Sequence, residues 1–342
     1  MKPLRFAIFG TGFWSRYQLS AWRELKGAEC VALYNRTRSK AETLGREFGI
    51  TAIYDDPEEL LRRERPDFVD IITDVASHAP LTRLAAKHGA AVICQKPMAT
   101  SLREAGAMVR DCDRRGVQFL VHENFRWQTP IRALAKELKR GAIGRPFRAR
   151  IDFISGFPVF DNQPFLAELE QFILTDVGSH ALDVARFLFG EARELYCKTQ
   201  RIHQHIKGED VATVLLEMHN GMTVTVNLAY AGNALEREAF PETLVFVEGD
   251  AGSAELAPGC ELRVTTRAGT QQTTATPPAY PWADSRYAVV HSSIVPCHAN
   301  LLDALQGRAK AETTGADNLR TVRLVFAAYR SAAKSRAVAI SE

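Results

Sequence analysis

Apolar runs and helical patterns alternate over the first third of the chain. Short apolar runs with the length of buried strands lie at residues 5–9, 30–34, 68–73, 91–94 and 118–121. Amphipathic stretches typical of helices lie between them, at residues 17–24, 40–48, 57–63, 80–88 and 102–115. Strands that alternate with helices predict right-handed crossovers and a parallel sheet. We therefore expect a doubly wound α/β domain over residues 1–122.

The pattern changes from residue 123 onward. Helices are predicted at residues 130–140 and 178–189, with a final helical stretch at 295–306 and 318–334. Alternating apolar and polar positions predict strands at residues 147–153, 212–218, 223–229, 243–248, 253–256 and 261–266. Short turn signals separate these strands, which favours antiparallel pairing, and residues 270–281 have the composition of a loop. We expect an α+β domain over residues 123–342 with a large, mostly antiparallel open sheet; its last helix is a candidate to pack back on the first domain.

Composition narrows the class of protein. The 342 residues suggest about two domains, and a hydrophobic content of 46% with 24% charged residues is ordinary for a globular protein. The formal net charge of +3 comes without a basic block, so neither nucleic acid nor a membrane is expected as a partner. The first strand begins too close to the N-terminus for a signal peptide. Six scattered cysteines predict reduced thiols in a cytoplasmic protein, without a disulfide or metal site.

The stretch from Gly10 to Ser15 links the first predicted strand to the first predicted helix. Gly10 permits a tight turn, Gly12 lets the backbone approach a pyrophosphate, and the helix N-terminus supplies free N–H groups. Ser15 stands at the third position of the GxGxxG fingerprint and is small enough for close packing. The alternative is an ordinary strand-to-helix turn. Because the strand, turn and helix occur together, we expect a dinucleotide site here.

The end of the second predicted strand carries no carboxylate. In NAD sites, an acid about 20 residues past the glycines usually accepts from the ribose 2′-hydroxyl. Here Asn35 can hydrogen-bond that hydroxyl, whereas Arg36 can either pair with a 2′-phosphate or stack on the adenine. No negative charge in this segment repels a phosphate. The sequence therefore permits either NAD or NADP.

The apolar run at 91–94 leads into Gln95, Lys96 and Pro97. The carboxyl ends of strands in a doubly wound sheet face the ligand crevice. A lysine there can donate to a substrate oxygen and stabilise a developing alkoxide. Pro97 is a candidate for a cis peptide bond. The alternative is a surface lysine paired with a carboxylate.

A second segment with chemical capacity is Asp176-Val-Gly-Ser-His180. Residues four apart share one face of a helix, so Asp176 and His180 lie together if a helix begins near Asp176. Histidine titrates near neutrality and can take a hydroxyl proton, while the carboxylate orients it. The alternative is an N-cap aspartate followed by a packed histidine.

The sequence resembles the Gfo/Idh/MocA family of nicotinamide-dependent oxidoreductases in three segments, which occur in the family's order and at its separations. They are the glycine turn, the Lys96-Pro97 pair and the stretch from Asp176 to His180. The resemblance covers nearly the whole chain, including residues 328–332. It implies an N-terminal Rossmann domain and a C-terminal domain for substrate binding and oligomerisation. It also implies that Lys96 is the lysine of the family's Asp/Glu-Lys-Pro motif, with Gln95 in place of the acid. Asp176 and His180 match the catalytic Asp-x-Gly-x-His pattern.

The resemblance adds positions near the cofactor. Thr73, Asp74 and His78 stand where the family usually has Thr-Pro-Asn and a histidine at a helix start, and the aspartate is unusual there. His78 either caps that helix or contacts the cofactor, and Trp14 and Trp127 either lie against the dinucleotide or pack in the core. The residues expected to contact the cofactor are Gly10, Thr11, Gly12, Phe13, Trp14, Asn35, Arg36, Thr73, Asp74, His78, Gln95, Lys96, Asn124, Arg126 and Trp127. Further candidates for substrate contacts are His122, His291 and His298.

The activity that the resemblance implies is reversible hydride transfer between nicotinamide C4 and a carbinol carbon of a sugar or polyol. His180 would accept the hydroxyl proton, Lys96 would polarise the oxygen and Asp176 would orient the pair. The stretch from Phe9 to Ser15 is similar to that of a branch that handles small aldoses such as D-apiose. Two alternatives stay open: a glycoside hydrolase that uses NAD transiently, and a non-catalytic NAD(P)-sensing regulator. A homodimer or homotetramer through the C-terminal sheet is also implied.

Overall fold

The computed structural model describes residues 2–236 and 238–340, which divide into two compact units. The first unit comprises the chain up to Glu123 together with Ile294–Val322. The second comprises Asn124–Ser293 and the chain from Arg323 onward. Residues 294–322, which the sequence pattern groups with the second domain, thus join the first unit.

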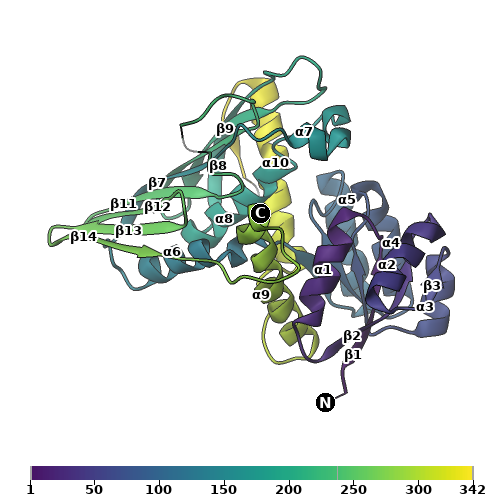
Figure 1. Ribbon diagram of the computed structural model, residues 1–342. Helices are drawn as coiled ribbons and strands as arrows, with labels where there is room; N and C mark the ends of the chain where they lie inside the picture. Colours follow the sequence, from purple (N-terminus) through teal and green to yellow (C-terminus); the bar gives the residue numbers. More distant parts are fainter. Residues whose placement is uncertain (1, 237, 341–342) are drawn as a thin grey trace. The chain divides into compact units, whose positions relative to one another are not determined.

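The first unit contains a parallel sheet of six strands in the order β3-β2-β1-β4-β5-β6 (Figure 1). Its strands are β1 (Leu4–Phe9), β2 (Ala28–Tyr34), β3 (Ile53–Tyr54), β4 (Phe68–Ile71), β5 (Ala91–Gln95) and β6 (Phe119–His122). The connecting helices are α1 (Phe13–Arg23), α2 (Arg38–Phe48), α3 (Pro57–Glu64), α4 (Val75–Lys87) and α5 (Leu102–Arg115). The order reverses between β1 and β4, and doubly wound sheets bind ligands at such a switch point. The predicted fold class of this unit is confirmed.

An aromatic cluster explains why β1 and β4 read as apolar runs. Phe6 of β1 stacks on Phe68 of β4 with ring centroids 4.9 Å apart, and Trp22 of α1 packs on both. All three side chains are buried. Burying one side chain of this size contributes roughly 1.5–3 kcal/mol to the stability of the fold. The cluster therefore fixes α1 against the strands that flank the switch point.

Some helices and strands begin at other residues than predicted, for local reasons. α1 begins at Phe13 rather than at residue 17, because Gly12 itself occupies the N-cap position. α4 begins at Val75, and Pro80 lies inside the helix, where it forgoes one backbone hydrogen bond, instead of starting it. The two-residue strand β3 was not expected; it exists through its pairing with the end of β2.

Residues 294–322 complete the first unit. The His298 ring stacks on Trp22 with centroids 4.0 Å apart. Val121 N–H donates to Thr313 O at 2.8 Å, and Thr313 Oγ1 donates to Val121 O at 2.7 Å. The segment belongs to two helices that have residues in both units, α9 (Ala288–Leu305) and α10 (Gly315–Lys334). The edge of β6 is therefore covered by chain from far along the sequence.

The second unit is built on a sheet of nine strands in the order β14-β13-β12-β11-β7-β10-β9-β8-β15 (Figure 1). The strands are β7 (Pro146–Ile154), β8 (Ala192–Gln200), β9 (Val211–Met218), β10 (Thr223–Ala229), β11 (Leu244–Gly249), β12 (Gly252–Ala257), β13 (Glu261–Thr266), β14 (Gly269–Thr274) and β15 (Val338–Ala339). Neighbouring strands are antiparallel except for β7 and β10, which run parallel. The predicted large and mostly antiparallel sheet is confirmed.

Helices cover one face of this sheet (Figure 1). Those that contact the strands are α6 (Thr129–Lys139) and α8 (Val177–Phe189). Short helical segments are η1 (Phe125–Trp127), α7 (Val159–Asn162), η2 (Pro164–Glu168) and η3 (Ser285–Tyr287). Along β10, Val224, Val226 and Leu228 are buried and alternate with half-exposed polar residues. This alternation, which the sequence shows plainly, leaves the other face of the sheet open.

Three predictions in this unit need correction. β14 lies where a loop was expected at residues 270–281, and β8 was not expected at all. β14 is polar and exposed, so its strand character comes from its ladder with β13 rather than from burial. α9 begins at Ala288 rather than at residue 295 and carries Pro296 inside it.

In the part of the chain that is described, helices fall short of the length and apolarity that crossing a membrane requires.

Candidate functional site

The glycine turn after β1 is shaped by close backbone contacts. Gly10 has a φ of +97°, and a Cβ on it would lie 2.3 Å from Ile72 O at the end of β4. Its N–H donates to Tyr34 O at 2.8 Å, and Ser15 Oγ donates to Gly10 O at 2.9 Å. Glycine is therefore required at residue 10 by the neighbouring strand, and Ser15 adds a hydrogen bond to the small size that the fingerprint needs.

The start of α1 fits a diphosphate. Its N-cap, Gly12, provides no side-chain cap, and its first turn contains no acidic residue. A Cβ on Gly12 would meet nothing within 4 Å, so the backbone there is open to a ligand. Thr11 Oγ1 is buried without a hydrogen-bond partner among the described residues. A hollow of about 230 Å³ adjoins the turn and is lined in part by Phe13 and Lys40. Open N–H groups, a helix dipole and an orphaned hydroxyl are what a phosphate requires.

Asn35 ties the glycine turn to the end of β2. Its Oδ1 accepts from Thr11 N–H at 3.1 Å, and its Nδ2 donates to Thr37 O at 3.0 Å. The side chain is half-buried. Asn35 therefore holds the turn in place, and the remaining lone pair and N–H of its amide are what it can offer to a ribose.

Arg36 is paired with Asp74. Its Nη2 lies 2.9 Å from Asp74 Oδ2, and both side chains are exposed. No negative charge was expected near Arg36 from its own segment, and the Asp74 carboxylate corrects this. Asp74 follows β4, at the N-cap position of α4, so it is distant from Arg36 in sequence while β2 and β4 both border β1. A search along one strand end cannot reveal such a carboxylate.

His78 is a buried link between two loops. One ring nitrogen lies 3.2 Å from Thr73 O and the other 3.1 Å from Pro97 O. The ring is 1% exposed, and this burial lowers its pKa. His78 therefore does not cap α4; it joins the loop after β4 to the turn that carries Lys96, and its contact with the cofactor stays a prediction.

Lys96 lies in a turn defined by its own neighbours. The Lys96–Pro97 peptide bond is cis, as the sequence suggested. Gln95 Oε1 accepts from Lys96 N–H at 2.8 Å, so the amide that replaces the family's acid folds back on the backbone. The Lys96 side chain is half-exposed at the carboxyl end of β5. It therefore lies at the edge of the sheet where ligands bind in doubly wound folds.

In the second unit, Asp176 and His180 lie at the start of α8. Asp176 is the N-cap residue, although its side chain makes no capping hydrogen bond. His180 is in the first turn, 4% exposed, and its ring lies parallel to that of Phe125 with centroids 3.7 Å apart. The predicted helix start is confirmed. The aromatic ring fixes the plane of the imidazole, which the sequence did not reveal.

Tyr230 also belongs to this part of the second unit. It follows β10 directly and is buried against Phe153 and Phe172, at centroid distances of 5.7 and 6.1 Å. Burial raises the pKa of Tyr230 well above its ordinary value, and the nearby Asp176 carboxylate raises it further. Tyr230 is therefore a neutral phenol beside Asp176, and no local motif identifies it.

A single glutamate holds the turn that precedes α8. The N–H groups of Phe172, Ile173 and Leu174 all donate to Glu209, the outer two to its carboxylate at 3.3 and 3.2 Å and the middle one to its backbone oxygen at 3.1 Å. Tyr329 OH donates to the same carboxylate at 2.6 Å, and burial with the glutamate charge raises the pKa of Tyr329. No motif in the sequence singles out Glu209.

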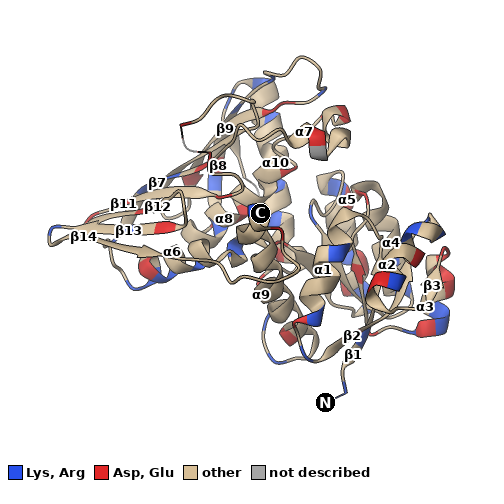
Figure 2. Cartoon of the chain, viewed as in Figure 1, with Lys and Arg blue, Asp and Glu red and all other residues tan. Residues whose placement is uncertain are grey.

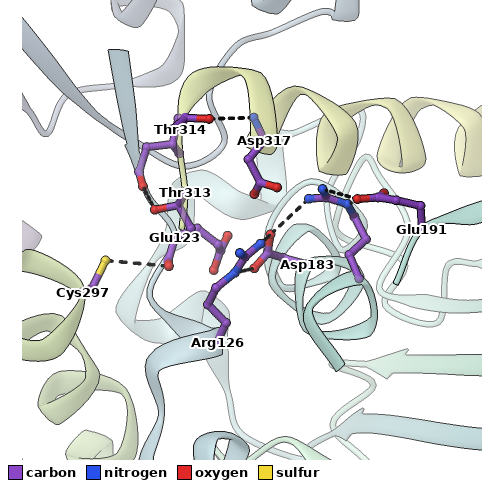
Figure 3. Close-up of polar contacts among 10 residues, drawn as sticks. Glu123, Arg126, Asp183, Glu191, Cys297, Thr313, Thr314 and Asp317 are labelled. Atoms are coloured by element: carbon purple, nitrogen blue, oxygen red, sulfur yellow. Dashed lines mark hydrogen bonds and ion pairs between the residues drawn. The ribbon is translucent and has the colours of Figure 1, made fainter. Parts of the chain in front are cut away.

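Arg126 forms a buried ion pair, and its predicted contact with the cofactor stays a prediction. Its Nε and Nη2 lie 2.7 and 2.5 Å from the two oxygens of Asp183, which is fully buried on α8 (Figure 3). Arg186 lies 3.6 Å from the same carboxylate and pairs with Glu191. A bidentate pair of this kind needs both partners because breaking it leaves a buried charge. Arg126 therefore anchors α8 through Asp183, which lies one turn after His180 and belongs to none of the predicted site residues.

Two further residues that were expected to contact the cofactor have partners within the second unit. Asn124 Nδ2 donates to Ser293 Oγ at 2.7 Å and to Val290 O at 3.3 Å. The Arg132 guanidinium lies 3.6 Å from the centre of the Trp127 ring. Both side chains thus have partners within the second unit, and their predicted contacts with the cofactor stay predictions.

The remaining histidines are core residues. His298 is fully buried against Trp22, and its burial lowers its pKa well below the ordinary value. His122 packs edge-on against it. His291 accepts from Asp284 N–H at 3.1 Å, and burial lowers its pKa to about 4. These three histidines were candidates for substrate contacts, but their side chains are buried inside the protein.

Known proteins agree with this arrangement. Residues 4–123 match the oxidoreductase family with an NAD-binding Rossmann fold, and residues 131–255 match the GFO/IDH/MocA C-terminal domain. D-apiose dehydrogenases of Paraburkholderia graminis and Rhizobium rhizogenes are each 44% identical over 99% of this chain, covering 90% and 98% of those relatives.

A solved structure extends the likeness. An oxidoreductase from Agrobacterium radiobacter, crystallised with NAD+, L-tartaric acid and magnesium, superposes with a TM-score of 0.97 at 44% identity, over 99% of both chains. The chain belongs to the Gfo/Idh/MocA family of oxidoreductases, with an NAD-binding Rossmann domain.

Proposed function

We propose that this protein is an NAD-dependent dehydrogenase of a small aldose, with D-apiose as its substrate. The observation that carries the proposal is the 44% identity to two D-apiose dehydrogenases over 99% of the chain. The fit of the glycine turn to a diphosphate supports the cofactor, and the retention of Lys96, Asp176 and His180 supports the reaction.

The chain's own groups perform the acid–base part of the reaction. When bound, NAD+ supplies the hydride acceptor. His180 takes the proton of the substrate hydroxyl, since an imidazole is the group best suited to this near neutral pH. Lys96 donates to the same oxygen and stabilises its developing negative charge. Asp176 supports the charged form of His180. Oxidation of an anomeric hydroxyl gives a lactone, and oxidation of any other secondary hydroxyl gives a keto sugar.

The test is the absorbance of reduced nicotinamide with D-apiose, other aldoses and polyols, each with NAD+. The variant His180→Ala should lower kcat by about 10²–10⁴-fold, since that is the usual contribution of a general base. Its affinity for NAD+, measured by titration without sugar, should stay at the wild-type value. The matched control is His219→Ala, because His219 is exposed in a turn.

Three results would count against the proposal. Near-normal turnover of His180→Ala would remove the assigned base. Glycoside cleavage without net reduction of NAD+ would favour a hydrolase that uses the cofactor transiently. Binding of NAD+ with no turnover of any sugar or polyol would favour a regulator.

We also propose a homodimer or homotetramer formed through the open face of the nine-stranded sheet. Leu215 of β9, which lies between buried Val214 and Leu216, is 44% exposed. Light scattering of the purified protein measures this directly. A cytoplasmic location is proposed as well, because all six cysteines are free thiols.

A further inference from the structure

We propose that Asp74 makes this protein prefer NAD to NADP, by occupying the Arg36 guanidinium that a 2′-phosphate would otherwise bind. The inference rests on the proposed function only in requiring that the glycine turn binds a dinucleotide. It assigns a specificity role to a carboxylate that lies outside the strand end where such a group is usually sought.

The topology brings the two side chains together. Tyr34 at the end of β2 and Ile71 at the end of β4 both pair with Phe9 of β1, so the two following loops border the glycine turn on either side. Arg36 and Asp74 lie in these loops, with Nη2 and Oδ2 2.9 Å apart. The adenosine ribose of a bound dinucleotide lies at the end of the second strand. The ion pair is therefore placed where the 2′ substituent has to be accommodated.

Asp74 supplies the carboxylate that the end of β2 lacks. In NAD sites an acid at that strand end accepts from the ribose 2′-hydroxyl, and its charge repels a 2′-phosphate. Here Asn35 stands at the position of the acid, and its Oδ1 already accepts from Thr11 N–H. A carboxylate from β4's loop serves the same two purposes, acceptance from a hydroxyl and repulsion of a phosphate.

Two neighbouring arginines are also paired with acids. Arg38 lies 3.1 Å from Glu42, and Arg16 lies 2.5 Å from Glu47. Figure 2 shows basic and acidic segments mixed over α2 and α3. These two pairs lie on α1 and α2 rather than in the loops after β2 and β4. A 2′-phosphate that enters between those loops meets Arg36, and a contact with Arg36 requires its pairing with the Asp74 carboxylate to be given up. A neutral 2′-hydroxyl has no such requirement.

The ion pair of Arg36 with Asp74 contributes little to the stability of the fold. Both side chains are largely exposed, at 78% for Arg36 and 51% for Asp74. Exposed ion pairs contribute little to folding. The pair has a larger effect on the binding of a 2′-phosphate, which carries up to two negative charges. Such a phosphate can form charge-assisted hydrogen bonds with Arg36 only where Asp74 does not occupy the guanidinium.

The test compares Asp74→Asn with the wild-type protein by titrating each with NAD+ and NADP+ in the absence of sugar. Calorimetry or quenching of tryptophan fluorescence reports both dissociation constants. Asn keeps the size of the side chain and removes its charge. NADP+ should bind about tenfold more tightly to the variant, as expected for removing one like charge a few ångströms from a phosphate, and the affinity for NAD+ should change by less than about threefold.

Two controls make the result specific. Glu42→Gln removes a carboxylate from Arg38 in the same region and should leave the ratio of the two affinities unchanged. The double variant Arg36→Ala/Asp74→Asn should lose the gain in NADP+ affinity, since the guanidinium that receives the phosphate is gone. The gain should also shrink at high salt, because exposed charges are screened.

The outcomes separate this inference from the proposed function. Wild-type protein that binds neither dinucleotide would overturn the proposed function itself. Wild-type protein that binds NADP+ as tightly as NAD+ would overturn the role of Asp74 and leave the function standing. An equal change in both affinities for Asp74→Asn, or the same gain from Glu42→Gln, would do likewise.

Discussion

Asp70, on β4 in the core of the first unit, shows how one side chain can make the whole fold sensitive to pH. It is fully buried and accepts from Trp22 Nε1 at 2.8 Å. Burial raises its pKa to about 7, so the folded protein holds a proton that the unfolded chain releases near pH 4. The contribution of this group to stability is complete below about pH 4 and is lost as the pH rises toward 7.

We predict that Asp70→Asn removes this pH dependence. Asn keeps an acceptor for Trp22 and carries no charge. In the wild-type protein the free energy of unfolding should fall between about pH 5 and pH 7, by at most about 1.4 kcal/mol per unit from this group. Urea melts across this range measure the slope, and the exposed Asp113→Asn is the control. An unchanged slope in Asp70→Asn would show that Asp70 does not titrate in this range.

Motifs made the local part of the candidate site predictable. Gly10, Gly12, Lys96 and His180 each stand out because a short stretch of neighbours defines their setting. The catalytic roles of Lys96, Asp176 and His180 stay predictions. Pairs such as Arg36 with Asp74 could not be predicted, because a sequence does not state which loops meet at the end of a sheet.

At the scale of elements, α8 depends on the turn before it. Glu209 receives three successive N–H groups of that turn, and Asp176 follows two residues after the last of them. A position fixed in this way would control how accurately the proposed catalytic groups meet a substrate. We therefore infer that Glu209 positions Asp176 and His180 through the backbone.

We predict that Glu209→Gln lowers kcat by about tenfold, because the amide cannot accept from all of the same donors and small misplacements are costly. Tyr329→Phe, which removes one donor to the same carboxylate, should have a smaller effect in the same direction. Affinity for NAD+ should not change, since the cofactor turn lies in the other unit. Steady-state kinetics with matched circular dichroism spectra measure this.

The control for this prediction is Glu217→Gln, an exposed glutamate on β9. A loss of stability with unchanged kcat would give Glu209 a purely structural role. An equal loss in Glu217→Gln would point to a general effect of charge.

Elements whose periodicity reflects burial were predictable, and those held by pairing alone were not. β10 alternates buried and outward residues and was expected with its present bounds. β14 has no buried residue, and its polar sequence reads as a loop until β13 provides a ladder. α4 was shortened in the prediction because proline usually starts a helix, whereas Pro80 lies within this one.

At the scale of the whole molecule, the first unit is discontinuous in sequence. A change of pattern near residue 123 marks where the parallel sheet ends, and it was read correctly as a change of fold. Hydrophobic periodicity is local, however, so it cannot show that residues 294–322 return to the first unit. His298 on Trp22 and Thr313 on Val121 become visible only in three dimensions.

This discontinuity leads to a last prediction about independent folding. A chain that ends at residue 123 should lack a cooperative unfolding transition, because it exposes the Trp22 ring and leaves the edge of β6 without the Thr313 contacts. Cys297 Sγ lies 3.8 Å from Glu123 O, so a Gly/Ser linker of about six residues can join residue 123 to residue 294. That linked chain, ending at residue 322, should unfold cooperatively in urea and should still bind NAD+. If the shorter chain folded as well as the linked one, residues 294–322 would be an accessory to the first unit and the boundary at residue 122 would describe its folding better.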